Sequence, residues 1–215
     1  MKRKSSYLIF AFLCINLNSI AQTILPNLSE KANWNLINRY SKAISENGKN
    51  GIFLNALPGD GAMVLKGVQF SSGTIEVDIK GADIMGQSFV GIVFHLQQDS
   101  SYDAVYLRPF NFFNADTLRR NRSVQYISMP NYPWEKLREQ WPGKYEHKVT
   151  SVQNANDWFH LKLIVNGNTI KAFVNSDPKP CLEVQKLTST KSGEVALWVG
   201  NNSSGAFANL KVTSQ

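Results

Sequence analysis

The sequence predicts an all-β fold in which two antiparallel sheets pack as a sandwich, interrupted by one long excursion of loop and short helix. Three observations support this prediction. Short apolar segments, several with strict alternation, recur from residue 51 to residue 213. Gly, Asn and Ser punctuate them, as in the turns of antiparallel sheets. One pair of segments flanks a strong hairpin turn, and its apolar faces match.

Residues 1–21 precede this pattern and have the features of a secretory signal peptide. A positively charged start at residues 2–4 is followed by an apolar run over residues 7–15, which is too short to span a bilayer. Residues 19–21 form a small-x-small cleavage site. We therefore expect cleavage near Ala21 and a secreted or periplasmic protein without a stable membrane anchor.

Charge and cysteine content restrict the chemistry of the remaining chain. The leader carries three of the 23 Lys and Arg residues, so 20 basic residues face 16 acidic ones and the net charge is +4. Only Cys181 follows the cleavage site, which precludes an intramolecular disulfide, and we expect a buried, unreactive thiol. Cys14 raises a lipoprotein alternative, which Leu13 disfavours because a small residue usually precedes a lipidated cysteine.

The strand predictions rest on alternation. In GTIEVDIKG, residues 73–81, Ile75, Val77 and Ile79 alternate with polar side chains, which indicates one buried and one wet face. SFVGIVFHL, residues 88–96, is a more continuous apolar run, as expected of a central strand. Further strands are expected at residues 51–56, 62–67, 103–108, 123–129, 159–165, 169–175, 181–187, 194–200 and 207–213.

The hairpin prediction can be tested by the parity of its side chains. Asn166-Gly167 is a strong two-residue turn signal, and it makes Leu163 oppose Ile170. A four-residue loop is the alternative, and it shifts the pairing by two without changing the faces. In both cases the apolar side chains of the two strands share one face.

The excursion covers residues 113–157. Pro133 is suited to the first turn of a short helix that runs to Gln140 and ends before Pro142-Gly143. A segment of this length inside a compact domain is usually functional or mobile. We expect residues 22–33 to be a lead-in segment and residues 34–215 to form one domain.

The strand segments at residues 73–81, 88–95, 102–112, 124–128, 158–175 and 193–212 together resemble the concanavalin A-like lectin/glucanase superfamily, particularly laminin-G-like and 3-keto-disaccharide hydrolase-like domains. The resemblance covers roughly residues 61–212. It implies a two-sheet jelly roll with one concave face, in a superfamily of lectins, carbohydrate-binding modules and glycosidases. The fold by itself therefore does not select a function.

Alternation also predicts a candidate site, a saccharide-binding groove on one sheet face. If Val105 and Leu107 face the core, Tyr106 and Arg108 face outward. The same parity turns His95 and Trp198 outward. Gln125 is a further candidate for the groove if its side chain also points outward. The predicted groove residues are His95, Tyr106, Arg108, Gln125, Trp134 and Trp198.

These residue types suit a sugar because a ring can cover the apolar C–H face of a pyranose, while arginine donates to hydroxyls or to a carboxylate. The alternative is that these side chains fill the curve of the sheet and pair with one another, with Arg108 stacked on Tyr106. For Trp134 and Trp141, we favour the interpretation that they anchor the excursion to the body of the domain, and the alternative is that their rings line a wall of the groove.

The sequence assigns no catalytic residues. Glycosidases need two acids beside one bond, and no such pair stands out. Glu76 and Asp78 are expected on a wet sheet face, Glu135 and Glu139 on an exposed helix surface, and Asp103 at the rim of the groove.

No metal-ligating spacing joins the three histidines, so the sequence indicates no metal or cofactor. Calcium bound by loop carboxylates is an alternative that laminin-G-like relatives imply, with Asp60, Asp99 and Asp103 as candidates. The arginines of LRRNR, residues 118–122, are either a solvated run or a recognition site for an acidic polysaccharide, and the modest net charge and the export signal argue against nucleic acid.

We therefore predict an exported carbohydrate-binding domain that recognises a saccharide in a concave groove. Two alternatives stay open. One is a glycoside hydrolase of the 3-keto-disaccharide hydrolase-like type, and the other is a laminin-G-like protein-interaction module.

Overall fold

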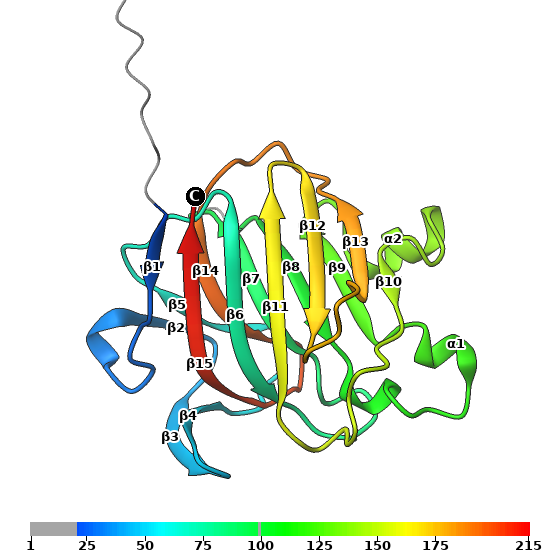
Figure 1. The fold of residues 1–215 in the computed structure, drawn as a ribbon, viewed down its shortest axis with the longest axis horizontal. Coiled ribbons are helices and arrows are strands. Elements are labelled where there is room, and N and C mark those ends of the chain that lie inside the picture. Colours follow the sequence, from blue (N-terminus) through cyan, green and yellow to red (C-terminus); the bar gives the residue numbers. More distant parts are fainter. Residues whose placement is uncertain (1–20, 99) are drawn as a thin grey trace, which may run out of the picture.

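The computed structural model describes residues 21–98 and 100–215, so the predicted signal peptide, Ala21 excepted, and Asp99 lie outside the described residues. Two antiparallel sheets pack face to face (Figure 1). The eight-stranded sheet has the order β13 (Leu182–Gln185), β12 (Thr169–Val174), β11 (Phe159–Asn166), β6 (Gly73–Lys80), β15 (Gly205–Ser214), β4 (Lys49–Leu54) and β3 (Ser41–Glu46), with β1 (Gln22–Ile24) also paired to β15. The seven-stranded sheet has the order β10 (Glu146–His147), β9 (Val124–Met129), β8 (Tyr102–Leu107), β7 (Val90–Leu96), β14 (Glu194–Val199), β5 (Gly61–Leu65) and β2 (Trp34–Ile37).

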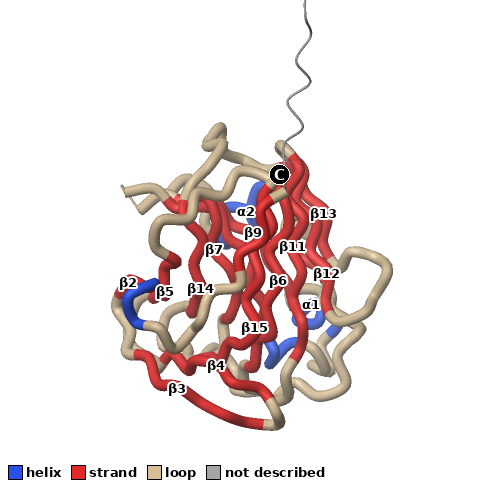
Figure 2. Tube along the Cα trace, turned by 60° about the vertical axis from the view of Figure 1, so that its left-hand side comes forward, coloured by secondary structure: helices blue, strands red, loops and turns tan. Residues whose placement is uncertain are grey.

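Four short helices complete the described chain: the 3-10 helices η1 (Lys31–Asn33) and η2 (Pro109–Asn111), and the α-helices α1 (Thr117–Arg120) and α2 (Trp134–Gln140). The β3–β4 hairpin projects from one end of the sandwich, away from α1 and α2 (Figure 1, Figure 2). In the part of the chain that the structure describes, none of the helices has the length and apolar character needed to cross a membrane.

The predicted all-β sandwich is confirmed, and its core follows the alternation of the sequence. Ile75, Val77 and Ile79 of β6 are fully buried against the other sheet. Val105 and Leu107 of β8 are buried on the inner face of the seven-stranded sheet. Burial of these apolar side chains between the sheets is the main favourable contribution to folding.

The side chains of the β11–β12 hairpin point to the predicted faces, but the pairing register differs by two residues from the one expected for an Asn166-Gly167 turn. Val165 pairs with Ile170 and Leu163 pairs with Ala172, which is the pairing of the four-residue alternative. The turn residue Gly167 has a positive φ of 56°, a conformation that glycine adopts without steric cost. These four paired side chains still point into the core, because a shift of two residues preserves parity.

The excursion forms the predicted short helix and two elements that the sequence did not indicate, α1 and β10. Helix α2 has Pro133 at its N-cap and runs from Trp134 to Gln140. The short helix α1, which the sequence did not indicate, begins after Asp116, whose side chain accepts a hydrogen bond from the N–H of Leu118 at 2.8 Å. The lead-in residues 22–33 include β1, which pairs with β15, and Leu28, which is buried in the core.

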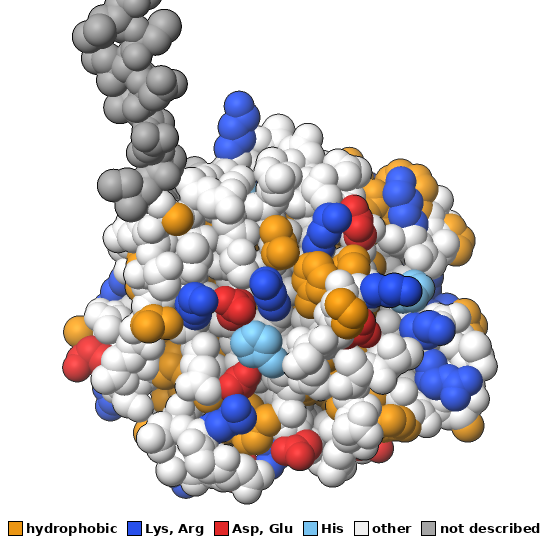
Figure 3. All heavy atoms as spheres, viewed as in Figure 1, with side chains coloured by type: hydrophobic (Ala, Val, Ile, Leu, Met, Phe, Trp, Pro, Cys, Tyr) orange, Lys and Arg blue, Asp and Glu red, His pale blue; other side chains and the backbone are white. Residues whose placement is uncertain are grey.

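The outer face of the eight-stranded sheet is exposed to solvent and carries basic and acidic side chains close to one another (Figure 3). His160 hydrogen-bonds Asp78 at 2.8 Å, and Lys49 and Asn209 donate to the same carboxylate at 2.7 Å each. Burial by itself would raise the pKa of Asp78, but these hydrogen bonds outweigh it and hold the pKa well below its ordinary value. Glu76, the other acid of β6, pairs with Lys211 at 3.1 Å, so both acids of this strand serve sheet-face ion pairs.

A buried polar cluster lies on the inner face of the seven-stranded sheet. The hydroxyl of Tyr126 donates to Asp103 at 2.6 Å, and the hydroxyl of Thr188 donates to the same carboxylate at 3.0 Å. His95 Nδ1 lies 3.4 Å from Asp103. Asp103 is therefore a buried structural acid, and its predicted place at the rim of the groove is wrong.

Tyr126→Phe tests this cluster, because it leaves the buried Asp103 carboxylate and the N–H of Leu187 without the Tyr126 hydroxyl. We expect the free energy of unfolding in urea to fall by about 1–3 kcal/mol. Tyr132→Phe removes a partly exposed hydroxyl in the excursion and should stay within about 0.5 kcal/mol of the parent. Equal stability of the two variants would show that the cluster contributes nothing to the fold.

Candidate functional site

Two adjoining cavities lie on the outer face of the seven-stranded sheet, and each has a volume of about 470 Å³. Both are lined by Phe89 and Trp134, so they form one continuous groove. We name the first the arginine cavity; its walls include Arg108, Arg119, Arg122 and Arg138. We name the second the ring cavity; its walls include Tyr106, Trp198, Asp60 and Glu135.

Aromatic rings form the floor of the groove. The rings of Tyr106 and Trp198, from β8 and β14, are 5.1 Å apart between centroids and tilted by 46°. Phe89 meets Tyr106 edge to face at 6.0 Å. Tyr106 is only 2% exposed and Trp198 only 5%, so they present ring surface to the cavity from below. Burial raises the pKa of Tyr106 to about 12, which keeps its hydroxyl neutral.

Arg108 follows β8 directly and lies at the junction of floor and wall. Its guanidinium donates to the hydroxyl of Tyr106 at 2.7 Å, to the carbonyl oxygen of Arg122 at 2.9 Å and to Gln125 Oε1 at 3.4 Å. It also stacks over the rings of Tyr106 and Phe89, at 4.9 and 5.7 Å from their centroids. Only 5% of Arg108 is exposed, and burial lowers its pKa.

All three acceptors of Arg108 are neutral. Within residues 21–98 and 100–215, no ion pair joins Arg108 to a carboxylate. An arginine stays protonated when buried, so the wall of the arginine cavity holds a desolvated positive charge without a contacting counterion.

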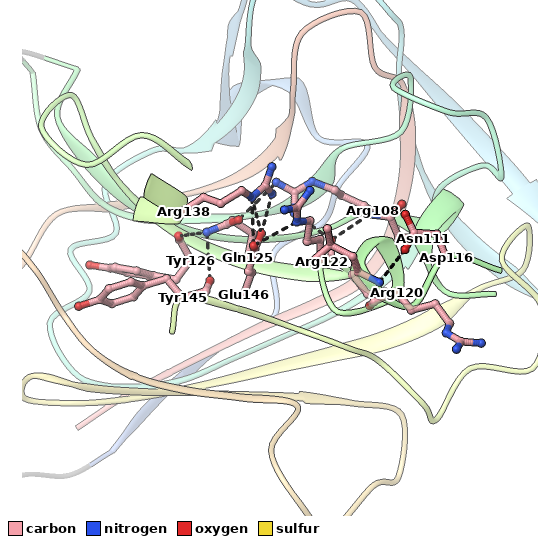
Figure 4. A network of polar contacts seen from close by, with 12 residues as sticks. Arg108, Asn111, Asp116, Arg120, Arg122, Gln125, Tyr126, Arg138, Tyr145 and Glu146 are labelled. Atoms are coloured by element: carbon pink, nitrogen blue, oxygen red, sulfur yellow. Dashed lines mark hydrogen bonds and ion pairs between the residues drawn. The ribbon is translucent and has the colours of Figure 1, made fainter. Parts of the chain in front are cut away.

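Two more arginines share a single acid beside Arg108. Arg138 Nη2 lies 2.6 Å from Glu146 Oε2, and Arg122 Nε lies 3.4 Å from Glu146 Oε1. Figure 4 shows Arg108, Arg122 and Arg138 converging around Gln125 and Glu146. Three arginines against one glutamate leave this cluster with a formal charge of +2.

Gln125 supports the cluster from beneath. It is 1% exposed, and its amide nitrogen donates to the carbonyl oxygens of Tyr126 and Tyr145 at 2.9 and 3.1 Å. These two bonds fix the amide so that its oxygen faces Arg108. Gln125 therefore orients Arg108 and is absent from the walls of both cavities.

Trp134 and Trp141 have different places. Trp134 begins α2, is 38% exposed and stacks on the guanidinium of Arg138 at 4.5 Å. It lines both cavities and forms the wall between them. Trp141 packs on Tyr132 and Tyr145 and against the hydrophobic core, as the anchoring interpretation predicted.

The structure brings five of the six predicted groove residues together and places the sixth elsewhere. Tyr106, Arg108, Gln125, Trp134 and Trp198 lie at or directly beneath the groove. His95 does not, because β7 bulges: Val93 pairs with Ala196 and Leu96 with Glu194, so two residues of β7 oppose one of β14.

The bulge turns His95 to the inner face. Its φ is +54°, and its Nε2 lies 2.9 Å from the carbonyl oxygen of Ser71 while its ring stacks near Phe70. The outward direction predicted for His95 by simple alternation is therefore wrong. Sequence reasoning also missed several groove residues, among them Asp60, Phe89, Glu135 and Arg138, which come from turns, loops and the excursion.

Cys181 lies outside the walls of both cavities, whereas Asp60, one of the calcium candidates, lines the ring cavity. The Cys181 thiol is half-buried, its Sγ donates to the carbonyl oxygen of Ala172 at 3.3 Å, and burial raises its pKa to about 12. Such a thiol is unreactive at neutral pH. In the described part of the chain, no three His, Cys, Asp or Glu side chains are grouped so as to hold a metal ion.

No protein-family model and no curated protein matches the chain in sequence. Solved structures do match it. The carbohydrate binding module CBM66 from Bacillus subtilis matches with a TM-score of 0.60 at 18% identity, over 83% of this chain and 94% of that one. A Bacillus subtilis protein with a galectin-like fold matches with a TM-score of 0.56 at 11% identity, over 87% and 93%.

The β-glucanase of Bacillus licheniformis is similar to the same extent, with a TM-score of 0.55 at 15% identity over 91% of this chain and 98% of that one. Identities this low are evidence for the fold and not for an activity. The chain therefore shares the two-sheet β-sandwich fold of these solved structures.

Proposed function

We propose that the protein is exported and binds an acidic saccharide in the groove, with the anionic group in the arginine cavity and a sugar ring in the ring cavity. The observation that carries this proposal is Arg108, a buried guanidinium whose contacts are all neutral. Burying a charge without a partner costs several kcal/mol, so such a group is retained where it serves a ligand.

The arginine cavity suits a carboxylate or a sulfate. Arg108, Arg122 and Arg138 supply more positive charge than Glu146 can neutralise. An anionic substituent entering this cavity would gain charge-assisted hydrogen bonds from planar guanidinium groups that other contacts already hold in place. A neutral sugar would leave the excess charge unpaired, and the electrostatics therefore favour an acidic ligand.

The ring cavity suits the body of a sugar. Tyr106 and Trp198 offer buried ring surface on the floor, and Trp134 offers an exposed ring on the wall. The apolar C–H face of a pyranose can pack on such rings, while its hydroxyls stay in water or reach polar groups at the rim. Trp134 lines both cavities, so it lies at the junction between the sugar ring and its anionic substituent.

Two further lines support the proposal. Structures of the same fold include a carbohydrate binding module and a β-glucanase. The features of residues 1–21 support export to the periplasm or beyond, where polysaccharides are found.

A carbohydrate array tests the proposal directly. The mature chain is probed against pectate, alginate, hyaluronan and chondroitin sulfate, and against neutral glucans, fructans and mannans. Binding confined to acidic polymers, weakening with salt, is the expected result. Binding to neutral polymers alone would contradict the arginine cavity, and binding to protein partners with no glycan hit would favour the laminin-G-like alternative.

Trp134→Ala removes the exposed ring shared by both cavities. We expect at least tenfold weaker binding to an acidic oligosaccharide by calorimetry, which corresponds to about 1.4 kcal/mol. Stability should change little because Trp134 is 38% exposed. Tyr40→Ala removes a ring that is 75% exposed outside the groove, and unchanged affinity is expected for it. Equal losses in both variants would argue against a role for Trp134 in the groove.

Arg108→Gln removes the buried charge and keeps a polar side chain. We expect affinity for an acidic oligosaccharide to fall at least about tenfold, with loss of the preference over its neutral analogue. Thermal unfolding should stay near that of the parent, because the change also relieves a desolvated charge.

Arg120→Gln is the matched control, since Arg120 is exposed on α1 and points away from the cluster (Figure 4). A steep fall in melting temperature for Arg108→Gln, with binding unaltered, would show that Arg108 serves packing alone.

A further inference from the structure

The floor of the groove follows one row of residues that pair across the seven-stranded sheet. Tyr106 of β8 pairs with Gly91 of β7, which in turn pairs with Trp198 of β14. Trp198 pairs with Ala62 of β5, and Ala62 pairs with Ile37 of β2. Paired residues of antiparallel strands share a face of the sheet. The row therefore continues on the same face past Trp198 to the edge strand β2.

A third cavity opens where the row reaches Ala62. It has a volume of about 90 Å³ and shares Asp60 and Trp198 with the ring cavity, so the two cavities adjoin. Pockets for whole small ligands have volumes of about 300 Å³ or more, so this one is the size of a substituent on a sugar. We name it the apolar notch, because most of its remaining lining is apolar: Ile37, Gly61, Ala62, Val93 and Leu96, with Ser100 and Tyr102.

The charge of the groove changes sign along the row. The arginine cluster around Arg108 has a formal charge of +2 at one end. The ring cavity carries Asp60 and Glu135, and among the residues that the structure describes neither forms an ion pair. An anionic group is attracted to the arginine end and repelled at the Asp60 end. The groove thus suits a saccharide with an acidic unit at one end and a neutral unit at the other.

Asp60 lines both the ring cavity and the apolar notch, and it supplies a hydrogen-bond acceptor where they meet. Its Oδ2 accepts one bond, from the hydroxyl of Tyr102 at 3.4 Å, and a carboxylate has acceptor sites for several donors. An acetamido group matches this combination, because its methyl group fits apolar walls and its N–H can donate to a carboxylate. O-acetyl and O-methyl groups have the methyl group but no N–H.

We propose, on the basis of the proposed function, that the groove recognises a polymer in which uronic acid alternates with an N-acetylated amino sugar. The carboxylate of the uronic acid lies in the arginine cavity, and the acetamido group of a neighbouring neutral unit lies in the apolar notch. Tyr106, which contacts Arg108, is three strands away from Ala62, or about 14 Å at about 4.8 Å per strand. This span exceeds one pyranose ring, so the two groups belong to different units of the chain.

Calorimetry with three hexasaccharides tests the ligand. Hyaluronan alternates uronic acid with an N-acetylated sugar, whereas pectate carries a carboxylate on every unit. We expect the mature chain to bind the hyaluronan hexasaccharide at least about tenfold more tightly than the pectate one. A hyaluronan hexasaccharide with N-formyl in place of N-acetyl keeps the N–H and loses the methyl group, and it should bind at least about threefold more weakly than the native form.

Ala62→Val tests the notch, because it places two further methyl groups in it on a strand that accommodates β-branched residues. Affinity for the hyaluronan hexasaccharide should fall at least about tenfold, and affinity for the pectate one should stay within about threefold. Ala43→Val is the matched control: the same change at an exposed position of β3, outside all three cavities, should leave both affinities unchanged.

The possible failures are distinguishable. Equal binding of the hyaluronan and pectate hexasaccharides, or unchanged hyaluronan affinity in Ala62→Val, overturns the notch as an acetamido site and leaves the acidic-saccharide proposal intact. An O-acetylated alginate hexasaccharide that binds as tightly as hyaluronan overturns the requirement for an N–H donor. A chain that binds none of these acidic saccharides overturns the proposed function itself.

Discussion

The groove depends on one buried guanidinium. Arg108 is held between the rings of Tyr106 and Phe89 and donates only to neutral acceptors. A desolvated charge of this kind is costly unless an opposite charge pairs with it, and in the proposed function the anionic group of the saccharide supplies that pairing. Gln125 and the carbonyl oxygen of Arg122 hold the guanidinium in one orientation, and its free donors therefore need no reordering when an anion arrives.

The sandwich makes this arrangement possible because the two faces of the seven-stranded sheet carry side chains with different roles. The cluster of Asp103, Tyr126 and His95 is fully buried between the sheets, where it can only stabilise the fold. The side chains of Tyr106 and Trp198 project from the other face of the same sheet and form the floor of the groove. The excursion then closes one wall with α2, whose Leu137 is buried in the core, so this segment both packs into the sandwich and shapes the site.

Alternation in the sequence was sufficient to predict the fold class and the shared face of Tyr106, Arg108 and Trp198, because a strand has a fixed period of two. It failed at His95, where a bulge inserts one residue and reverses the parity. Alternation also could not predict that Asp60 and Glu135 line the same cavity. The two residues are 75 positions apart, and their placement depends on strand order and on the path of the excursion. Local patterns carry no information about such distant pairing.

The most direct measurement of the central claim is a nitrogen-15 NMR titration of the arginine and tryptophan side chains with an acidic oligosaccharide and its neutral analogue. The account predicts that the Arg108 guanidinium and the Trp134 indole signals shift together on addition of the acidic sugar, and far less with the neutral one. Unchanged Arg108 signals in the presence of a saturating acidic ligand would contradict it.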